Sequence, residues 1–246
     1  MKIAKFIFLG APGAGKGTYA KLLCSRSNGK WRHLSPGDFF RQEIKNQTPT
    51  GQLLTSYIQS GKLVPENTVM DVWLPKVTKE LEELEKTYSV SEVAFPPGVI
   101  LDGYPRSLAQ CNALDTLVPQ GQNFVAININ LRKDILVSKL LGRCNCKLCG
   151  ASYNTADILD GEYDMPAILP TTPCRVANAG ELCSKHFEKR ADDIEEVIRH
   201  RLEEYEQSVH GILDYYKKQN RLIEIELKRG VKDIDKLWNI MSQERL

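Results

Sequence analysis

The sequence has no large excess of charge of one sign. Its 246 residues carry 33 basic and 31 acidic side chains, which gives a formal net charge of +2. Proteins that bind nucleic acid usually show a clear basic excess, so this near balance argues against an obligatory nucleic-acid partner. The chain is long enough for one sizeable core or two modest domains.

Long hydrophobic runs are also missing. No run approaches the roughly 20 apolar residues that a membrane span needs, so we expect no membrane partner. A glycine-rich segment interrupts the first apolar stretch too early for a signal peptide, which favours a first buried strand instead. We therefore expect a reducing compartment, the cytoplasm by default, in which the seven cysteines are not first candidates for disulfides. Repeats and low-complexity linkers are lacking, and nothing in the sequence indicates an oligomer, so we expect a monomer.

What the sequence does have is a nearly complete phosphate-binding loop, GAPGAGKGT, at residues 10–18. The general pattern is Gly, four residues, Gly, Lys, then Ser or Thr. Gly10, Gly15 and Lys16 fit this pattern, whereas Gly17 occupies the place of the hydroxyl residue and Thr18 follows one position later. The match predicts a bound nucleoside triphosphate.

Strand and helix patterns alternate along most of the chain. Such alternation predicts an α/β fold with a parallel sheet covered by helices on both faces. We expect strands at 3–9, 31–34, 98–102, 124–131 and 221–227, and helices at 16–25, 39–46, 51–60, 66–86, 133–141, 192–216 and 233–243. Residues from about 142 to 189 are rich in Cys, Pro and Gly and lack helical periodicity, so we expect an irregular segment there.

The loop has the context that phosphate binding requires. A strand before it and a helix after it would place free backbone N–H groups and the positive end of a helix dipole around one point. Lys16 is then expected to contact the β- and γ-phosphates. The apolar strand at 99–102 ends in Asp102, a carboxylate that could hold Mg²⁺ directly or through water.

Six segments follow one another in a fixed order: GAPGAGKGT (10–18), SPGDFFR (35–41), GKLVPE (61–66), LDGYPRSLAQ (101–110), LLGR followed by CKLCGASYN (within 140–154), and RADDIEEVIRHRLEEY (190–205). Together they closely resemble the adenylate kinase family of nucleoside monophosphate kinases in its long-lid form, which includes GTP:AMP phosphotransferase-like members. The resemblance covers residues from about 3 to 230.

The resemblance implies a P-loop NTPase fold with two inserted domains. The core would comprise 1–34, 65–141 and 191–246, with a monophosphate-binding domain at 35–64 and a lid at 142–190. It also leaves a mitochondrial location open beside the cytoplasmic one, because some relatives enter mitochondria without a removable presequence.

The resemblance further implies roles for individual residues. The catalytic set would be Lys16, Arg41, Arg106, Arg143, Arg190, Arg201 and Asp102. The triphosphate would be bound by Gly13, Ala14, Gly15, Lys16, Gly17, Thr18, Lys139, Arg143, Ser152 and Tyr153. The monophosphate would be bound by Ser35, Arg41, Leu63, Val64, Gly103, Arg106, Gln110, Arg190 and Arg201. Lid closure would involve pairs between arginines and Asp192 or Asp193.

Physical chemistry supports the same residue types independently. The attacking group is already ionised near neutral pH, because the second pKa of a phosphate monoester is about 6. The enzyme therefore needs no general base; it must bring two anions into line and stabilise the spread charge. That task favours many arginines, whose planar fork binds phosphate bidentately, together with one lysine and Mg²⁺ carried by the nucleotide.

The lid also contains half of a zinc motif. Cys146 and Cys149 match the first half of the family's zinc-binding lid. In the second half, Gly180 stands where the first cysteine is usual, and Cys183 occupies the second place.

Cys174, which follows a stretch of extra residues at 156–173, could supply the missing ligand. We expect one structural Zn²⁺ held tetrahedrally by Cys146, Cys149, Cys174 and Cys183. The alternatives are substitution by His186 or Cys144, or a site that has decayed.

Two further departures from the family pattern leave the choice of acceptor base and donor base undecided. Pro36 replaces a hydroxyl residue near the acceptor base, although Gln110 remains to recognise adenine. Lys139 replaces an arginine that stacks on the donor base, and lysine cannot stack in the same way.

The sequence therefore predicts transfer of the terminal phosphate of ATP or GTP to AMP. The alternatives are a GTP-preferring AMP kinase, a kinase for UMP or CMP, which the long lid disfavours, and a nucleotide-binding regulator with weakened catalysis.

Overall fold

A computed structural model describes residues 3–59, 64–88, 96–119, 122–177, 180–190 and 193–243 of the chain. Five parallel strands form the central sheet in the order β10-β4-β1-β3-β2. Their bounds are β1 Ala4–Leu9, β2 Trp31–Leu34, β3 Gly98–Asp102, β4 Val125–Asn130 and β10 Leu222–Glu226. The predicted fold class and all five expected strands are confirmed.

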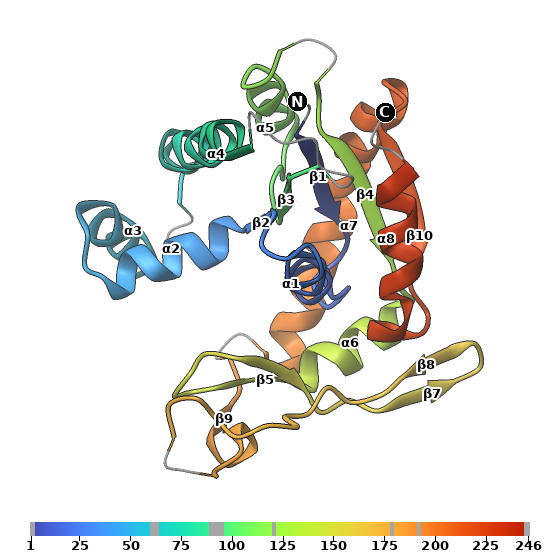
Figure 1. The fold of residues 1–246 in the computed structure, drawn as a ribbon. Coiled ribbons are helices and arrows are strands. Elements are labelled where there is room, and N and C mark those ends of the chain that lie inside the picture. Colours follow the sequence, from blue (N-terminus) through green and yellow to red (C-terminus); the bar gives the residue numbers. More distant parts are fainter. Residues whose placement is uncertain are drawn as a thin grey trace.

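Helices cover both faces of this sheet (Figure 1). The helices of the described residues are α1 Lys16–Arg26, α2 Pro36–Lys45, α3 Pro49–Gln59, α4 Glu66–Tyr88, α5 Leu108–Asp115, α6 Lys133–Leu141, α7 Glu195–Lys218 and α8 Ile234–Gln243, with short 3-10 turns at Cys183–His186 (η1) and Gly230–Asp233 (η2). None of the helices in the described part of the chain is both long and apolar enough to cross a membrane.

The two faces of β1 show how the sheet organises the core. Ile7 and Leu9 pack with α4, α5 and the end of α7, while Phe6 and Phe8 pack with α1, α6 and α8. All four side chains are buried, as expected for a parallel strand covered on both sides. The sheet is therefore the rigid platform from which the loops at its carboxyl ends project.

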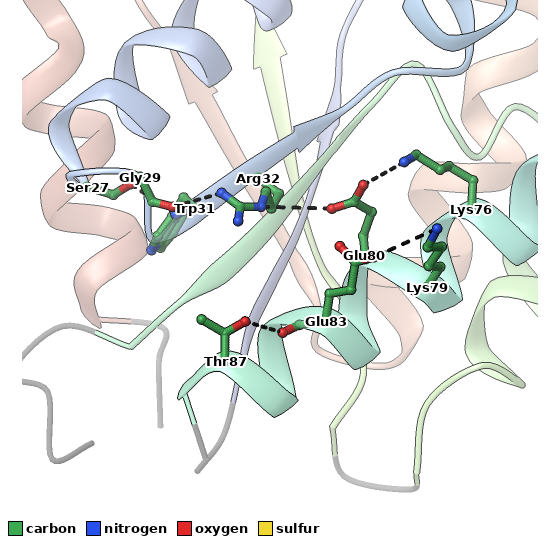
Figure 2. A network of polar contacts seen from close by, with 9 residues as sticks. All are labelled: Ser27, Gly29, Trp31, Arg32, Lys76, Lys79, Glu80, Glu83 and Thr87. Atoms are coloured by element: carbon green, nitrogen blue, oxygen red, sulfur yellow. Dashed lines mark hydrogen bonds and ion pairs between the residues drawn. The ribbon is translucent and has the colours of Figure 1, made fainter. Parts of the chain in front are cut away.

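The outer edge of the sheet, strand β2, is joined to α4 by charged side chains (Figure 2). Glu80 of α4 lies 3.8 Å from the guanidinium of Arg32 and accepts a 2.6 Å bond from Lys76. Its side chain is only 14% exposed, so this pairing is more sheltered than the neighbouring i,i+4 pairs of α4. The contact fixes α4 beside an edge that would otherwise be open.

Helices α2 and α3 form a small unit that extends away from the sheet (Figure 1). They approach closely at Gly51, where a Cβ would lie 2.1 Å from the carbonyl oxygen of Glu43. Only glycine permits this contact, because any side chain would collide with the backbone of α2. Helix α2 begins at Pro36, earlier than the predicted residue 39, because proline suits the first helical position.

The lid segment is more regular than predicted. Strands β5 (Arg143–Cys146), β6 (Ser152–Asn154) and β9 (Phe187–Glu188) form one antiparallel sheet, and β7 (Ile158–Asp160) and β8 (Tyr163–Met165) form a separate hairpin. The expectation of an irregular segment was wrong, because strands of two to four residues are too short to show a readable alternation.

Two helices also differ from expectation. Helix α5 was not predicted; it is short, and Ser107 caps it by accepting a bond from the backbone N–H of Gln110. Helix α7 begins at Glu195, three residues after the expected start. Residues 191 and 192 lie outside the described part of the chain.

Candidate active site

The glycine loop lies at the carboxyl end of β1 and leads directly into α1. Gly10, Gly13 and Gly15 all have positive φ angles, at 140°, 89° and 87°. A Cβ at Gly10 would lie 2.5 Å from the carbonyl oxygen of Ile129, so the loop can follow this path only without side chains. The result is a set of backbone N–H groups at a helix N-terminus, which is an anion site.

Lys16, the first residue of α1, crosses the mouth of this loop. Its amine donates to the carbonyl oxygens of Gly10 at 2.7 Å and Ala11 at 3.0 Å. Burial lowers the pKa of Lys16 to about 8, and the positive charges of Arg106, Arg201 and Arg143 act in the same direction. The charges of three arginines thus act on Lys16, and this positive potential favours a polyanion.

Asp102 lies beside the lysine because β3 pairs with β1, in a register that sets Asp102 opposite Phe8. Burial opposes its ionisation, but a hydrogen bond from His33 and the charge of Lys16 hold the pKa of Asp102 below its ordinary value. The carboxylate is therefore ionised and next to the loop, where a cation accompanying a phosphate could be held.

This carboxylate also gives a reason for the misfit at Gly17. A Cβ at position 17 would lie 3.0 Å from Oδ2 of Asp102, which is closer than side chains normally approach. Glycine therefore leaves room for the carboxylate.

The sequence analysis missed His33, at the carboxyl side of β2. Its Nε2 lies 3.3 Å from Oδ2 of Asp102, and its side chain is only 10% exposed. The neighbouring pairing of β2 with β3 brings the two residues together. The signal that could have found it is a histidine near the end of the strand that precedes the SPGD segment.

Two residues expected at the acceptor follow β3: Arg106 lies in the loop after this strand, and Gln110 lies in helix α5. The Nε of Arg106 donates to the carbonyl oxygen of Gly103 at 2.9 Å, and its backbone N–H donates to Oε1 of Gln110 at 2.7 Å. Gln110 is buried, so the bond fixes the orientation of its amide toward the loop. Gly103 has a φ angle of 78°, which allows the sharp turn at the end of β3.

Other predicted acceptor residues lie on or next to helices α2 and α4. Arg41, exposed on α2, pairs with Asp38 at 2.5 Å. Ser35 stands at the N-cap of that helix, and Val64 precedes α4. Leu63 lies outside the described residues.

The lid begins with a bidentate ion pair. Arg143 donates to both oxygens of Asp193, at 2.8 and 2.5 Å, and the Asp193 side chain is fully buried. The predicted pairing of Asp193 with an arginine is therefore present, while Asp192 lies outside the described residues. Arg190 precedes that turn and accepts, through its carbonyl oxygen, a 3.1 Å bond from the backbone N–H of Asp193.

Three residues expected at the triphosphate lie on elements other than the glycine loop. Ser152 and Tyr153 lie on β6 in the lid, where the Tyr153 ring packs 5.2 Å from that of Phe187. Lys139 lies on α6, and burial lowers the pKa of its amine.

Four cysteines meet at the far end of the lid. The sulfur atoms of Cys146, Cys149, Cys174 and Cys183 all lie within 4.8 Å of one another. The Cys146–Cys174 and Cys149–Cys183 pairs are 3.9 and 3.6 Å apart, too far for disulfides. Four thiolates around a tetrahedral ion with bonds of about 2.3 Å would be about 3.8 Å apart, so the cluster has the geometry to hold a metal ion.

A backbone bridge explains how Cys174 reaches this cluster. Pro173 and Leu182 pair as an antiparallel bridge, and the N–H of Cys174 donates to the carbonyl oxygen of Glu181 at 2.7 Å. This short ladder brings Cys174 beside Cys183, although the two are nine positions apart in the sequence.

Comparison with known proteins agrees with this geometry. A family model described as "Adenylate kinase" matches residues 8–221. The chain is 33% identical over 243 residues to a GTP:AMP phosphotransferase of Plasmodium falciparum, covering 98% of this chain and 97% of that protein. It is 33% identical over 240 residues to an adenylate kinase of Borrelia turicatae, covering 97% of this chain and 99% of that protein. An adenylate kinase of Caldanaerobacter subterraneus is 32% identical over 244 residues, covering 98% and 96%. The chain therefore belongs to the adenylate kinase family of nucleoside monophosphate kinases.

Proposed function

We propose that the protein reversibly transfers the terminal phosphate of ATP or GTP to AMP and so forms two nucleoside diphosphates. The observation that carries this proposal is the cationic cluster at the glycine loop, where Lys16 lies among Arg106, Arg143 and Arg201 beside the ionised Asp102. Family membership supports the same reaction.

In the transfer, an oxygen of the acceptor's phosphate attacks the terminal phosphorus of the donor. The bond between that phosphorus and its bridging oxygen breaks, and the electron pair leaves with the donor diphosphate. Lys16 and the loop N–H groups would stabilise the donor phosphates, while Arg106 would hold the acceptor phosphate. Adenylate kinases use Mg²⁺ with the nucleotide, and Asp102 is the carboxylate that would hold it, directly or through water.

The remaining roles follow the domain division. Residues 35–64 would close over AMP and carry Arg41 to its phosphate, and lid residues within 142–190 would close over the donor and exclude water. Arg143, Arg190 and Arg201 would then converge on the transferred phosphate. The Arg143–Asp193 pair supports this proposal, because it joins strand β5 to Asp193, two positions before α7 begins.

A GTP preference is the second candidate. Its motivation is Lys139, because an amine cannot stack on a base as a guanidinium does. The similar Plasmodium protein that carries the name GTP:AMP phosphotransferase adds weight to it.

Initial rates with AMP and either donor test the proposal. We expect both nucleoside diphosphates to form, with AMP used at least about tenfold better than UMP or CMP as judged by kcat/KM. The ratio of kcat/KM for ATP and GTP then decides between the donors. Tight nucleotide binding without any diphosphate would favour the regulator instead.

The pH dependence of donor use follows from Lys16. Below pH 8 its amine is protonated and attracts the donor phosphates; as the pH rises through about 8, the free enzyme loses that charge. We therefore expect kcat/KM for the triphosphate to fall above about pH 8, because this parameter reports the free enzyme. Measured for AMP with saturating donor, kcat/KM should not show this fall, since a bound triphosphate keeps Lys16 protonated. Equal profiles for both substrates would contradict the assignment.

We also propose that the four-cysteine cluster holds one structural Zn²⁺. Thiolate ligands and a tetrahedral spacing favour zinc, and transfer needs no zinc-bound water. The metal would join two parts of the lid, the β5–β6 turn and the segment around η1.

A further inference from the structure

The extra residues of the lid form an arm that leaves the rest of the lid. Strands β7 and β8 pair antiparallel, and below them Asn154 and Ile168 exchange both backbone hydrogen bonds, at 3.0 and 2.7 Å. We call residues 155–167 the arm. Figure 1 shows it projecting beneath α6 toward α8 and the end of β10.

The arm packs on the core through an apolar face. Ile158, Tyr163 and Met165 form a cluster with Ile135 of α6, and none of the four is more than 9% exposed. At the other end of α6, the N–H of Thr155 donates to the carbonyl oxygen of Gly142 at 2.8 Å. The arm therefore contacts both ends of α6, and its cluster would be exposed if it moved with the rest of the lid.

Hydrogen bonds then fasten the arm to the loop that follows β10. The N–H of Asp164 donates to the carbonyl oxygen of Lys228 at 3.0 Å, and the Asp164 carboxylate accepts from the Lys232 amine at 2.8 and 3.0 Å. The Tyr163 hydroxyl donates to Glu226 at the end of β10. Met165 covers Gly230, where a Cβ would lie 3.5 Å from the methionine side chain.

Arg132, at the start of α6, adds a second anchor. Its guanidinium lies 5.2 Å from the centre of the Tyr163 ring and bonds to Asp160 and Asp134. Its backbone N–H donates to the Tyr163 hydroxyl at 3.3 Å. Exposed ion pairs are individually weak, but here they surround a buried ring and act together.

The loop that the arm holds lies on a definite side of the active site. The phosphate loop follows β1, whereas the acceptor residue Arg106 follows β3 and the small helical unit follows β2. Because the strand order is β10-β4-β1-β3-β2, the carboxyl ends of β4 and β10 lie on the opposite side. Ligands of such sheets bind across the carboxyl ends, so the donor's nucleoside must extend toward β4 and β10.

We propose that the arm is a positioning element, fixed to the core, that holds residues 227–232 in the conformation that receives the donor nucleoside. The assignment of this nucleoside to the phosphate donor rests on the proposed function. Only the remainder of the lid, with the cysteine cluster, then moves on closure. Removing the arm lowers the fraction of molecules with a competent loop, and apparent affinity falls by that fraction.

The test replaces residues 155–167 by Asn-Gly. Asn154 and Ile168 form a hydrogen-bonded pair, which a two-residue type I′ turn closes naturally. We expect KM for ATP to rise about three- to tenfold, while KM for AMP and kcat change by less than about twofold. Hydrogen exchange of the amides at 228–233 should accelerate in the same variant.

Point variants keep the inference falsifiable if the deletion variant fails to fold. Asp164→Ala should change exchange and KM in the same direction but less, whereas Leu159→Ser, at an arm residue that is 85% exposed, should change neither. Unchanged exchange at 228–233 in Asp164→Ala, or a parallel rise of KM for AMP, overturns the proposal. If no diphosphate forms with any donor, the proposed function fails, but the exchange experiment still decides whether the arm holds the loop.

Discussion

Replacing Arg106 by alanine is expected to lower kcat about 10²- to 10³-fold, the usual cost of removing one group that stabilises charge in the transition state. The charge of Arg106 acts on Lys16 and Arg201, and its own hydrogen bonds are to Gly103 and Gln110. Because it is exposed and lies outside the core, the fold should be retained. Steady-state rates, with thermal unfolding measured in parallel, check both statements.

Two companion variants sharpen this result. Arg106→Lys should recover only part of the rate, because a lysine keeps the charge but cannot bind phosphate with a planar fork. Arg199→Ala removes an exposed arginine that pairs with Glu195 on α7, and should leave kcat within about twofold of the natural protein. An Arg106→Ala enzyme with near-normal kcat would remove Arg106 from the reaction.

Loss of the proposed zinc site is expected to have the second large effect. Structural zinc contributes about 10–16 kcal/mol to the folding of small zinc-finger peptides at neutral pH, and the lid end offers little other core. The buried residues of the small apolar cluster at this end of the lid are Cys146, Cys174 and Cys183 themselves. We expect the purified protein to carry one zinc per chain by elemental analysis, and Cys174→Ser to lose most of it.

Turnover should fall at least about tenfold in Cys174→Ser, because an unfolded lid cannot position its arginines or exclude water. Cys144→Ser is the matched control. Cys144 lies in strand β5 together with Cys146 but outside the four-cysteine cluster, so this variant should keep its zinc. Natural protein without zinc, or equal zinc in the two variants, would refute the assignment.

The sequence predicted the parts of the site whose geometry is local. The glycine loop, Lys16 and the strand ending in Asp102 depend on a short strand–loop–helix unit, so their spacing along the chain nearly determines their spacing in space. The four cysteines were also identified, since the structure brings together the predicted set.

The sequence could not predict contacts that depend on register between distant segments. His33 reaches Asp102 only because β2 and β3 are neighbours in the sheet. The pairing of β3 with β1 likewise brings Asp102 close to Gly17. Neither of these two contacts produces a recognisable pattern in the amino-acid sequence.

The arm shows the same limit more strongly. Its strands have three residues each, so alternation is unreadable, and its partners lie more than sixty positions later at Glu226, Lys228 and Lys232. From the sequence, residues 156–173 were only an insertion. The structure shows that part of the insertion packs on the core and not on the lid.

In the proposed reaction, phosphate passes directly from a triphosphate to AMP. The measurement that tests it most directly mixes ATP labelled at the terminal phosphate with unlabelled AMP and locates the label in the products. We expect the label at the β-phosphate of the ADP made from AMP, with little in inorganic phosphate. Label in inorganic phosphate, or label that stays in ATP, would contradict the account.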